Sequence, residues 1–191
     1  TTVPVPIKRD VWVRAVEVLP GNRSVLHHAL VSVNYPKGHP SPFKRKGRWL
    51  NGVFASYVPG MDGEVFPANT GRYLPAGSKL VFQMHYTTTG RSEIDATKLG
   101  LYFSKDNSLK EFRIAGPRNL KIQIPPKAKA YRASSEQEFQ QNVTLYSIFP
   151  HMHFRGKSMR FDATYPDGST ERLLSVPNYD FNWQRGYVLE P

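Results

Sequence analysis

The sequence contains no cysteine among its 191 residues. Disulfide bonds, thiolate metal sites and a cysteine nucleophile are therefore excluded. This absence leaves the cellular compartment open, because a chain without thiols tolerates an oxidising environment but does not require one. Long hydrophobic runs are also lacking. Since no apolar stretch approaches the length of a bilayer crossing, we expect no membrane span.

Acidic residues are few compared with basic ones, at 15 Asp and Glu against 26 Lys and Arg, for a net charge of +11. Such an excess is typical of proteins with acidic partners, including nucleic acids and anionic surfaces. The densest basic cluster, residues 44–48, follows a stretch rich in proline and glycine and is predicted to lie in a loop. No nucleic-acid-binding motif accompanies it, so we interpret the cluster as a solvated loop and expect no nucleic-acid partner.

Glycine and proline are plentiful, with 14 and 16 residues, and separate many short apolar runs. This pattern predicts an all-β fold. A Pro-Asp-Gly-Ser turn at 166–169 predicts a hairpin between strands 160–165 and 170–174. The Pro125-Pro126 pair predicts a boundary between domains 1–123 and 124–191. Further strands are expected at residues 11–18, 25–33, 49–57, 78–87, 99–103 and 143–148.

The six histidines carry the clearest chemical signal. Five of them lie in or beside predicted strands: His27, His28, His85, His151 and His153. A histidine alone is usually packed or hydrogen-bonded, but two doublets and a third histidine at a strand end together predict metal binding. Imidazoles suit copper and zinc, and spacing does not choose between the two.

The two doublets make different geometric demands. Strand alternation would place His151 and His153 on one face, where they could share an ion, although a third ligand is missing from that stretch. His27 and His28 are adjacent and would face opposite ways. Both can bind one metal only at a twist, a bulge or a strand end; alternatively, one of them is structural. The sixth histidine, His39, belongs to the basic loop and is expected to be solvated.

Other catalytic motifs are missing. The chain has no glycine-rich phosphate loop, no GxSxG nucleophile elbow and no HExxH helix.

Three histidine motifs and one linker motif occur in a distinctive order across nearly the whole chain. They are His27-His28, Gln83-Met84-His85-Tyr86, Ile124-Pro125-Pro126, and His151-Met152-His153 followed by Gly156. In this order and spacing the sequence resembles the copper type II, ascorbate-dependent monooxygenases, the family of peptidylglycine α-hydroxylating and dopamine β-hydroxylating enzymes. It is more similar still to bacterial relatives of that family.

The resemblance implies two jelly-roll β-sandwiches with an open cleft between them. His27, His28 and His85 would hold an electron-storing copper, while His151 and His153 would hold the catalytic copper together with a methionine further along the chain. O₂ would be activated at the second site to hydroxylate a C–H bond of a small organic substrate, with ascorbate supplying electrons. The resemblance also implies a periplasmic or secreted protein whose signal peptide is not in this chain, which begins at Thr1.

Two departures from the family pattern affect these expectations. The chain ends at Pro191, before the place of the methionine ligand; Met152 should face away from the metal, and Gly156 should break the strand before Met159. We therefore expect a partial second domain, completed by a missing segment or by another chain. The peptide-amidating members grip the substrate carboxylate with an arginine where this chain has Phe149, so a peptide C-terminus is not the expected substrate.

Two alternative functions remain at the level of sequence. One is a copper- or zinc-binding β-sandwich module or accessory subunit without turnover. The other is a structural sandwich that mediates contacts and keeps its histidines in the core.

Overall fold

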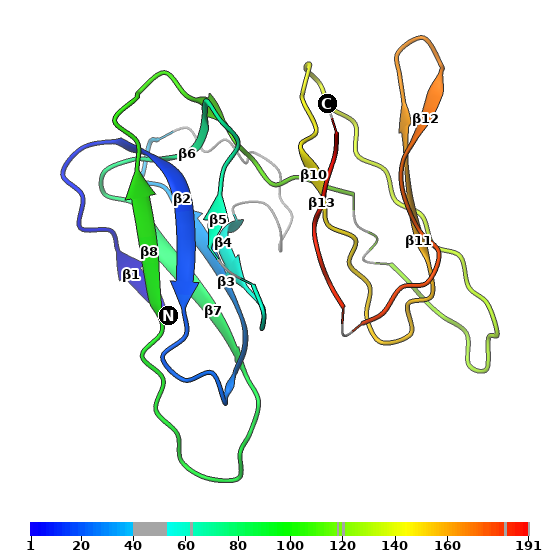
Figure 1. Cartoon of the computed structure of the whole chain (residues 1–191), viewed down its shortest axis with the longest axis horizontal. Coiled ribbons are helices and arrows are strands. Elements are labelled where there is room, and N and C mark those ends of the chain that lie inside the picture. The colour runs from blue at the N-terminus through cyan, green and yellow to red at the C-terminus, as the bar shows by residue number, and fades with distance from the viewer. Residues whose placement is uncertain (40–52, 62, 118, 120, 182, 191) are drawn as a thin grey trace. The chain divides into compact units, whose positions relative to one another are not determined.

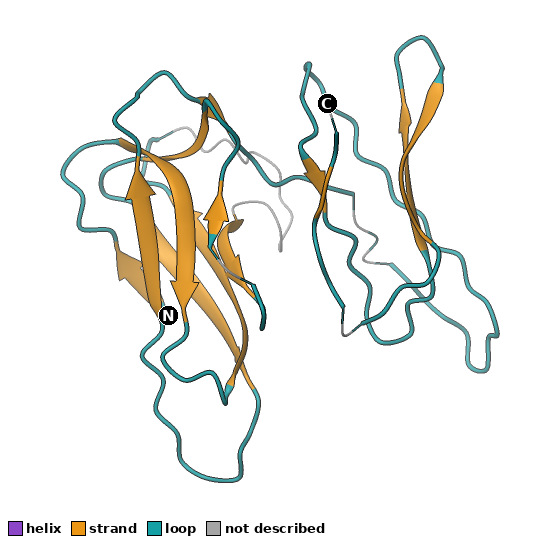
Figure 2. Ribbon diagram, in the orientation of Figure 1, coloured by secondary structure: helices purple, strands orange, loops and turns teal. Residues whose placement is uncertain are grey.

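The computed structural model describes residues 1–39, 53–61, 63–117, 119, 121–181 and 183–190. Every regular element in these ranges is a strand, which confirms the predicted all-β class (Figure 2). The strands of the first part of the chain are β1 (Thr2–Pro4), β2 (Val11–Leu19), β3 (Leu26–Asn34), β4 (Val53–Tyr57), β5 (Glu64–Val65), β6 (Thr70–Leu74), β7 (Lys79–Tyr86), β8 (Lys98–Phe103) and β9 (Lys110–Glu111). Those of the second part are β10 (Ser147–Ile148), β11 (Met159–Thr164), β12 (Thr170–Val176) and β13 (Tyr187–Val188).

The chain forms two compact units, Thr1–Gln137 and Glu138–Pro191. The domain ranges 1–123 and 124–191 stay a prediction. No helix in the described part of the chain is long and apolar enough to cross a membrane.

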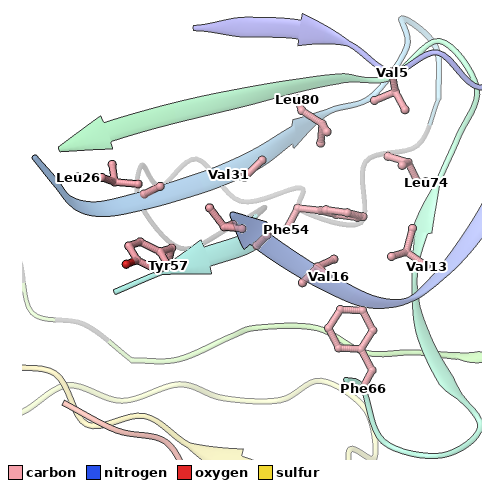
Figure 3. Close-up of a cluster of buried hydrophobic side chains, with 13 residues drawn as sticks. Val5, Val13, Val16, Leu26, Val31, Phe54, Tyr57, Phe66, Leu74 and Leu80 are labelled. Carbon is pink, nitrogen blue, oxygen red and sulfur yellow. The ribbon is translucent and has the colours of Figure 1, made fainter. Parts of the chain in front are cut away.

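The first unit is a sandwich of two sheets. One sheet has the order β1-β7-β3-β4, and the other has the order β5-β2-β6-β9 with β8 also paired to β2 (Figure 1). Apolar side chains from both sheets interdigitate in one core, as Figure 3 illustrates. Leu26 and Val31 enter this core from β3, and Val13 and Leu74 enter it from the opposite sheet. Jelly-roll connectivity stays a prediction.

A bulge in β2 sets which of its side chains reach the core. Val13 pairs with Phe103 of β8 and Ala15 with Tyr102, so β2 has one extra residue, Arg14, at this point. Strict alternation from Val13 would turn Val16 away from the core. Because Arg14 is the extra residue, the alternation of side chains shifts by one position after it, and Val16 faces the core and is buried.

Among the described residues of the first unit, one charged side chain is buried, that of Arg72 in β6, which is 4% exposed. Its Nη2 donates to both carboxylate oxygens of Glu64 at 3.1 Å, and its guanidinium carbon lies 4.2 Å from the ring centroid of Phe66. Burial lowers the pKa of the Arg72 guanidinium, and the Glu64 carboxylate opposes that shift. The ion pair compensates for placing a charge next to the core.

The described residues of the second unit form two separate two-stranded sheets, β10-β13 and β11-β12. The β11–β12 hairpin confirms the predicted turn, where Gly168 has a φ of +84°. The strand predicted over 143–148 is wrong over most of its length, because only Ser147–Ile148 is a strand. Within 138–181 and 183–190 these ladders do not close into a sandwich, and the expectation of a partial domain stays a prediction.

Candidate metal centres

Antiparallel pairing of β3 with β7 brings the first histidine cluster together. His28 lies opposite His85, and Leu26 lies opposite Tyr86, so two steps along β3 correspond to one step along β7. The extra residue is His27. The adjacent histidines therefore sit at a bulge, one of the three arrangements that would allow both to serve one ion.

The three imidazoles of this cluster are close to one another. The ring centroids of His27 and His28 are 5.0 Å apart with an interplanar angle of 64°, and those of His28 and His85 are 4.0 Å apart and stacked at 24°. His27 is exposed, and the other two are half-buried. None of them belongs to the hydrophobic core, so the interpretation of these histidines as core residues is wrong.

A hydrogen-bonded loop supports the strand ends that carry the cluster. Asp95 accepts hydrogen bonds from the phenol of Tyr86 at 2.9 Å and from the backbone N–H of Asn22 at 2.9 Å. Burial alone would raise the pKa of Asp95, but the bonds from Thr97, Tyr86 and the Asn22 backbone outweigh it and lower that pKa. Asp95 thereby links the turn before β3 to the end of β7.

The spacing of the rings can be compared with what a shared ion requires. A metal–nitrogen distance of about 2 Å and a near-tetrahedral angle place the centroids of two imidazoles on one ion about 5 Å apart. The pair His27 and His28 meets this spacing at 5.0 Å. Stacked rings direct their in-plane nitrogen lone pairs side by side, so His28 and His85 would have to separate by about 1 Å and rotate to converge on an ion.

The second cluster follows β10 in the other unit. His151 and His153 lie beyond the strand, and both are exposed. Their ring centroids are 5.2 Å apart and nearly perpendicular at 85°, which also meets the spacing for one shared ion. The pair is brought together by an irregular segment rather than by strand alternation.

The backbone between these two histidines is held by Tyr179. Its phenol oxygen accepts the Met152 N–H at 3.1 Å and donates to the Met152 carbonyl at 2.7 Å. Gly156 ends the segment, with its N–H donating to the His153 carbonyl at 2.8 Å. The expectation that Gly156 breaks the strand is wrong, because β10 already ends at Ile148, and Met159 is the first residue of a separate strand, β11.

A glutamine contacts the first histidine of this pair. His151 Nδ1 lies 2.7 Å from Oε1 of Gln184, whose Nε2 donates to the Phe181 carbonyl at 2.9 Å. A small cavity of about 50 Å³ lies nearby in the same unit, and His151 and His153 are not among its lining residues. The histidine pair is thus open to solvent rather than enclosed with this cavity.

Neither cluster is a complete metal site in this conformation. No group of three or more His, Asp or Glu side chains among the described residues is arranged to hold a metal ion. The donor chemistry and the spacing of two of the imidazole pairs fit copper or zinc, whereas the His28–His85 stack must open first.

The surroundings of the sixth histidine, His39, differ from those that the sequence predicts. His39 is half-buried, and its ring stacks on Tyr35 with centroids 5.3 Å apart. The expectation that His39 is simply solvated is therefore wrong. The basic cluster 44–48 lies outside the described residues.

Sequence reasoning did not identify Tyr179 or Gln184 as site residues. They lie 27 and 33 positions from the residues that they contact, and no local motif marks either one. No protein-family model, curated protein or solved structure matches this chain.

Proposed function

We propose that this protein binds copper at both histidine clusters and is an oxidoreductase of the ascorbate-dependent copper monooxygenase type. The observation that carries the proposal is the register of β3 against β7. This register brings His85 next to the adjacent pair His27 and His28, from which it is far apart in the sequence, and each of the three rings lies within 5.0 Å of its neighbour. His151 and His153 would hold the second ion in the other unit.

The donor set supports copper in particular through the resemblance of the histidine motifs to that family. Imidazole binds both copper and zinc, and copper generally binds the more tightly of the two. Bound copper would supply one-electron transfer and O₂ activation. The protein's own contribution is to fix the imidazoles on a bulged strand pair and on a segment held by Tyr179, and to leave the second pair accessible to a small organic substrate.

Copper titration of the intact chain tests the proposal. We expect one ion per cluster, with one ion lost in His85→Ala and one lost in His153→Ala. His39→Ala is the matched control, because His39 contacts Tyr35 and Tyr73 and belongs to neither cluster. Equal copper content in the wild type and both cluster variants would overturn the assignment.

Turnover is tested separately, with the copper-loaded chain and ascorbate. Hydroxylation of a small-molecule substrate should stop when ascorbate or O₂ is withheld. The second-site variant His153→Ala should abolish it without removing copper from the first cluster. The periplasmic or secreted location and the completion of the second unit by another chain or segment stay predictions.

A second candidate is a copper- or zinc-binding module without turnover. The absence of a third His, Asp or Glu ligand beside His151 and His153 in the described residues favours it. Stoichiometric metal binding with no ascorbate-dependent product would select this alternative.

A further inference from the structure

The side chain of Gln184 is anchored at both ends of its amide. Its Nε2 lies 2.9 Å from the Phe181 carbonyl oxygen, and its Oε1 lies 2.7 Å from Nδ1 of His151. Gln184 itself is half-buried, and it follows a turn in which the Trp183 N–H donates to the Asp180 carbonyl at 3.1 Å.

These contacts fix which way the amide points. A carbonyl oxygen only accepts, so the group facing Phe181 must be the NH₂ of Gln184. With the amide in the reverse orientation, two acceptor oxygens would meet at hydrogen-bond distance. The Oε1 atom is therefore the group that faces His151.

The amide orientation determines the state of the His151 ring. Because Gln184 Oε1 can only accept, Nδ1 of His151 must carry the proton. In the neutral ring the lone pair then resides on Nε2. A neutral imidazole in water favours the opposite tautomer, so the protein must hold His151 in this form.

We propose that Gln184 is a positioning residue for His151, holding its ring in the Nδ1–H tautomer so that Nε2 is the atom offered to a metal ion shared with His153. The metal-binding part rests on the proposed function, and the tautomer part does not. Hydrogen bonds to the second nitrogen of a ligating histidine orient the ring and increase its basicity as a ligand.

The tautomer can be read directly in the metal-free, full chain. In ¹⁵N-labelled protein at about pH 8.5, where imidazoles are neutral, long-range ¹H–¹⁵N spectra distinguish Nδ1–H from Nε2–H rings. We expect His151 to be Nδ1–H in the wild type and in Gln184→Glu, whose carboxylate also accepts. In Gln184→Leu the ring should shift towards Nε2–H.

Gln141→Leu is the matched control, since Gln141 is an exposed glutamine of the same unit and should leave the His151 signal unchanged. An Nε2–H ring in the wild type would overturn the proposal without any variant, so the test does not depend on the folding of Gln184→Leu. An unchanged His151 signal in folded Gln184→Leu would overturn it as well.

Copper binding then tests the consequence for the metal. In chelator competition, Gln184→Leu should weaken the second cluster by about 10- to 100-fold and leave the first unchanged. If His151 has the expected tautomer but the wild type binds no copper there, the proposed function fails and the tautomer assignment stands. Equal copper affinity in Gln184→Leu and the wild type would overturn the positioning role.

Discussion

The phenol of Tyr179 forms two hydrogen bonds with the backbone of Met152, accepting its N–H and donating to its carbonyl. Met152 lies between the histidines of the second cluster, so this contact fixes the peptide units that set the spacing of their rings. The two partners are 27 residues apart. One side chain therefore ties the histidine segment to the chain that precedes β13.

Removing this phenol should loosen the histidine segment. In Tyr179→Phe the Met152 N–H loses its acceptor, so its amide should exchange with solvent about tenfold faster or more. Hydrogen exchange measured by NMR on the full chain checks this. Tyr165→Phe is the control, because the Tyr165 phenol donates to Glu171 on the β11–β12 hairpin and its loss should leave the Met152 amide unaffected. Unchanged Met152 exchange in Tyr179→Phe would contradict the role of this contact.

A methyl group at Gly156 should disturb the same segment. A Cβ at this position would lie 2.6 Å from Met152 Cβ and 2.9 Å from Tyr179 Cδ1, so the backbone would have to shift. We expect Gly156→Ala to lower the free energy of unfolding of the second unit by about 1–3 kcal/mol. Urea unfolding followed by NMR resolves the two units.

Gly116→Ala provides the comparison for this variant. A Cβ at Gly116 meets nothing within 4 Å, and its φ lies outside the left-handed region. Identical unfolding midpoints for the second unit in the two alanine variants would show that Gly156 is not required by packing.

Glu64 and Arg72 form the ion pair beside the core of the first unit. In Glu64→Gln the Arg72 charge stays buried without its partner, so the first unit should lose about 3 kcal/mol of stability. Replacing the pair by apolar residues in Arg72→Met/Glu64→Leu should recover part of this loss. Chemical denaturation of both variants, with the exposed Glu171→Gln as control, measures the difference. A double variant less stable than Glu64→Gln would contradict this account.

Much of the fold could be predicted from alternation and turn chemistry. The sequence pattern anticipated β2, β3, β7, β8 and the β11–β12 hairpin, because each combines apolar alternation with clear Gly or Pro punctuation. It failed over 143–148 because a strand also needs a partner ladder. Here the short β13 pairs with only two residues of this run.

The candidate site was predictable only in part. Adjacent histidines in a strand require a local irregularity to act together, but its location at His27 depends on the register of β7 and not on local sequence. Tyr179 and Gln184 could not be found, since their roles arise from tertiary contacts of otherwise ordinary residues. Residue type indicated the candidate ligands, whereas the residues that contact them could be identified only from the fold.

The half-buried phenol of Tyr35 should make stability depend on pH in the alkaline range. Burial, together with the nearby Glu111 carboxylate, raises the pKa of Tyr35 from 10.0 to about 12. The folded protein therefore retains this proton at a pH where the unfolded chain loses it. The stabilisation from this group is fully present below pH 10 and is lost as the pH rises to about 12.

We expect the wild type to lose stability relative to Tyr35→Phe across that interval, in urea unfolding at successive pH values. Ultraviolet absorbance of the folded chain should show a phenol that ionises near pH 12 in the wild type and in Tyr131→Phe but not in Tyr35→Phe. If the free energy of unfolding changed with pH in the same way in the wild type and in Tyr35→Phe, the raised pKa of Tyr35 would be contradicted. Such a result would mean that the Tyr35 phenol has the same pKa in the folded and unfolded states.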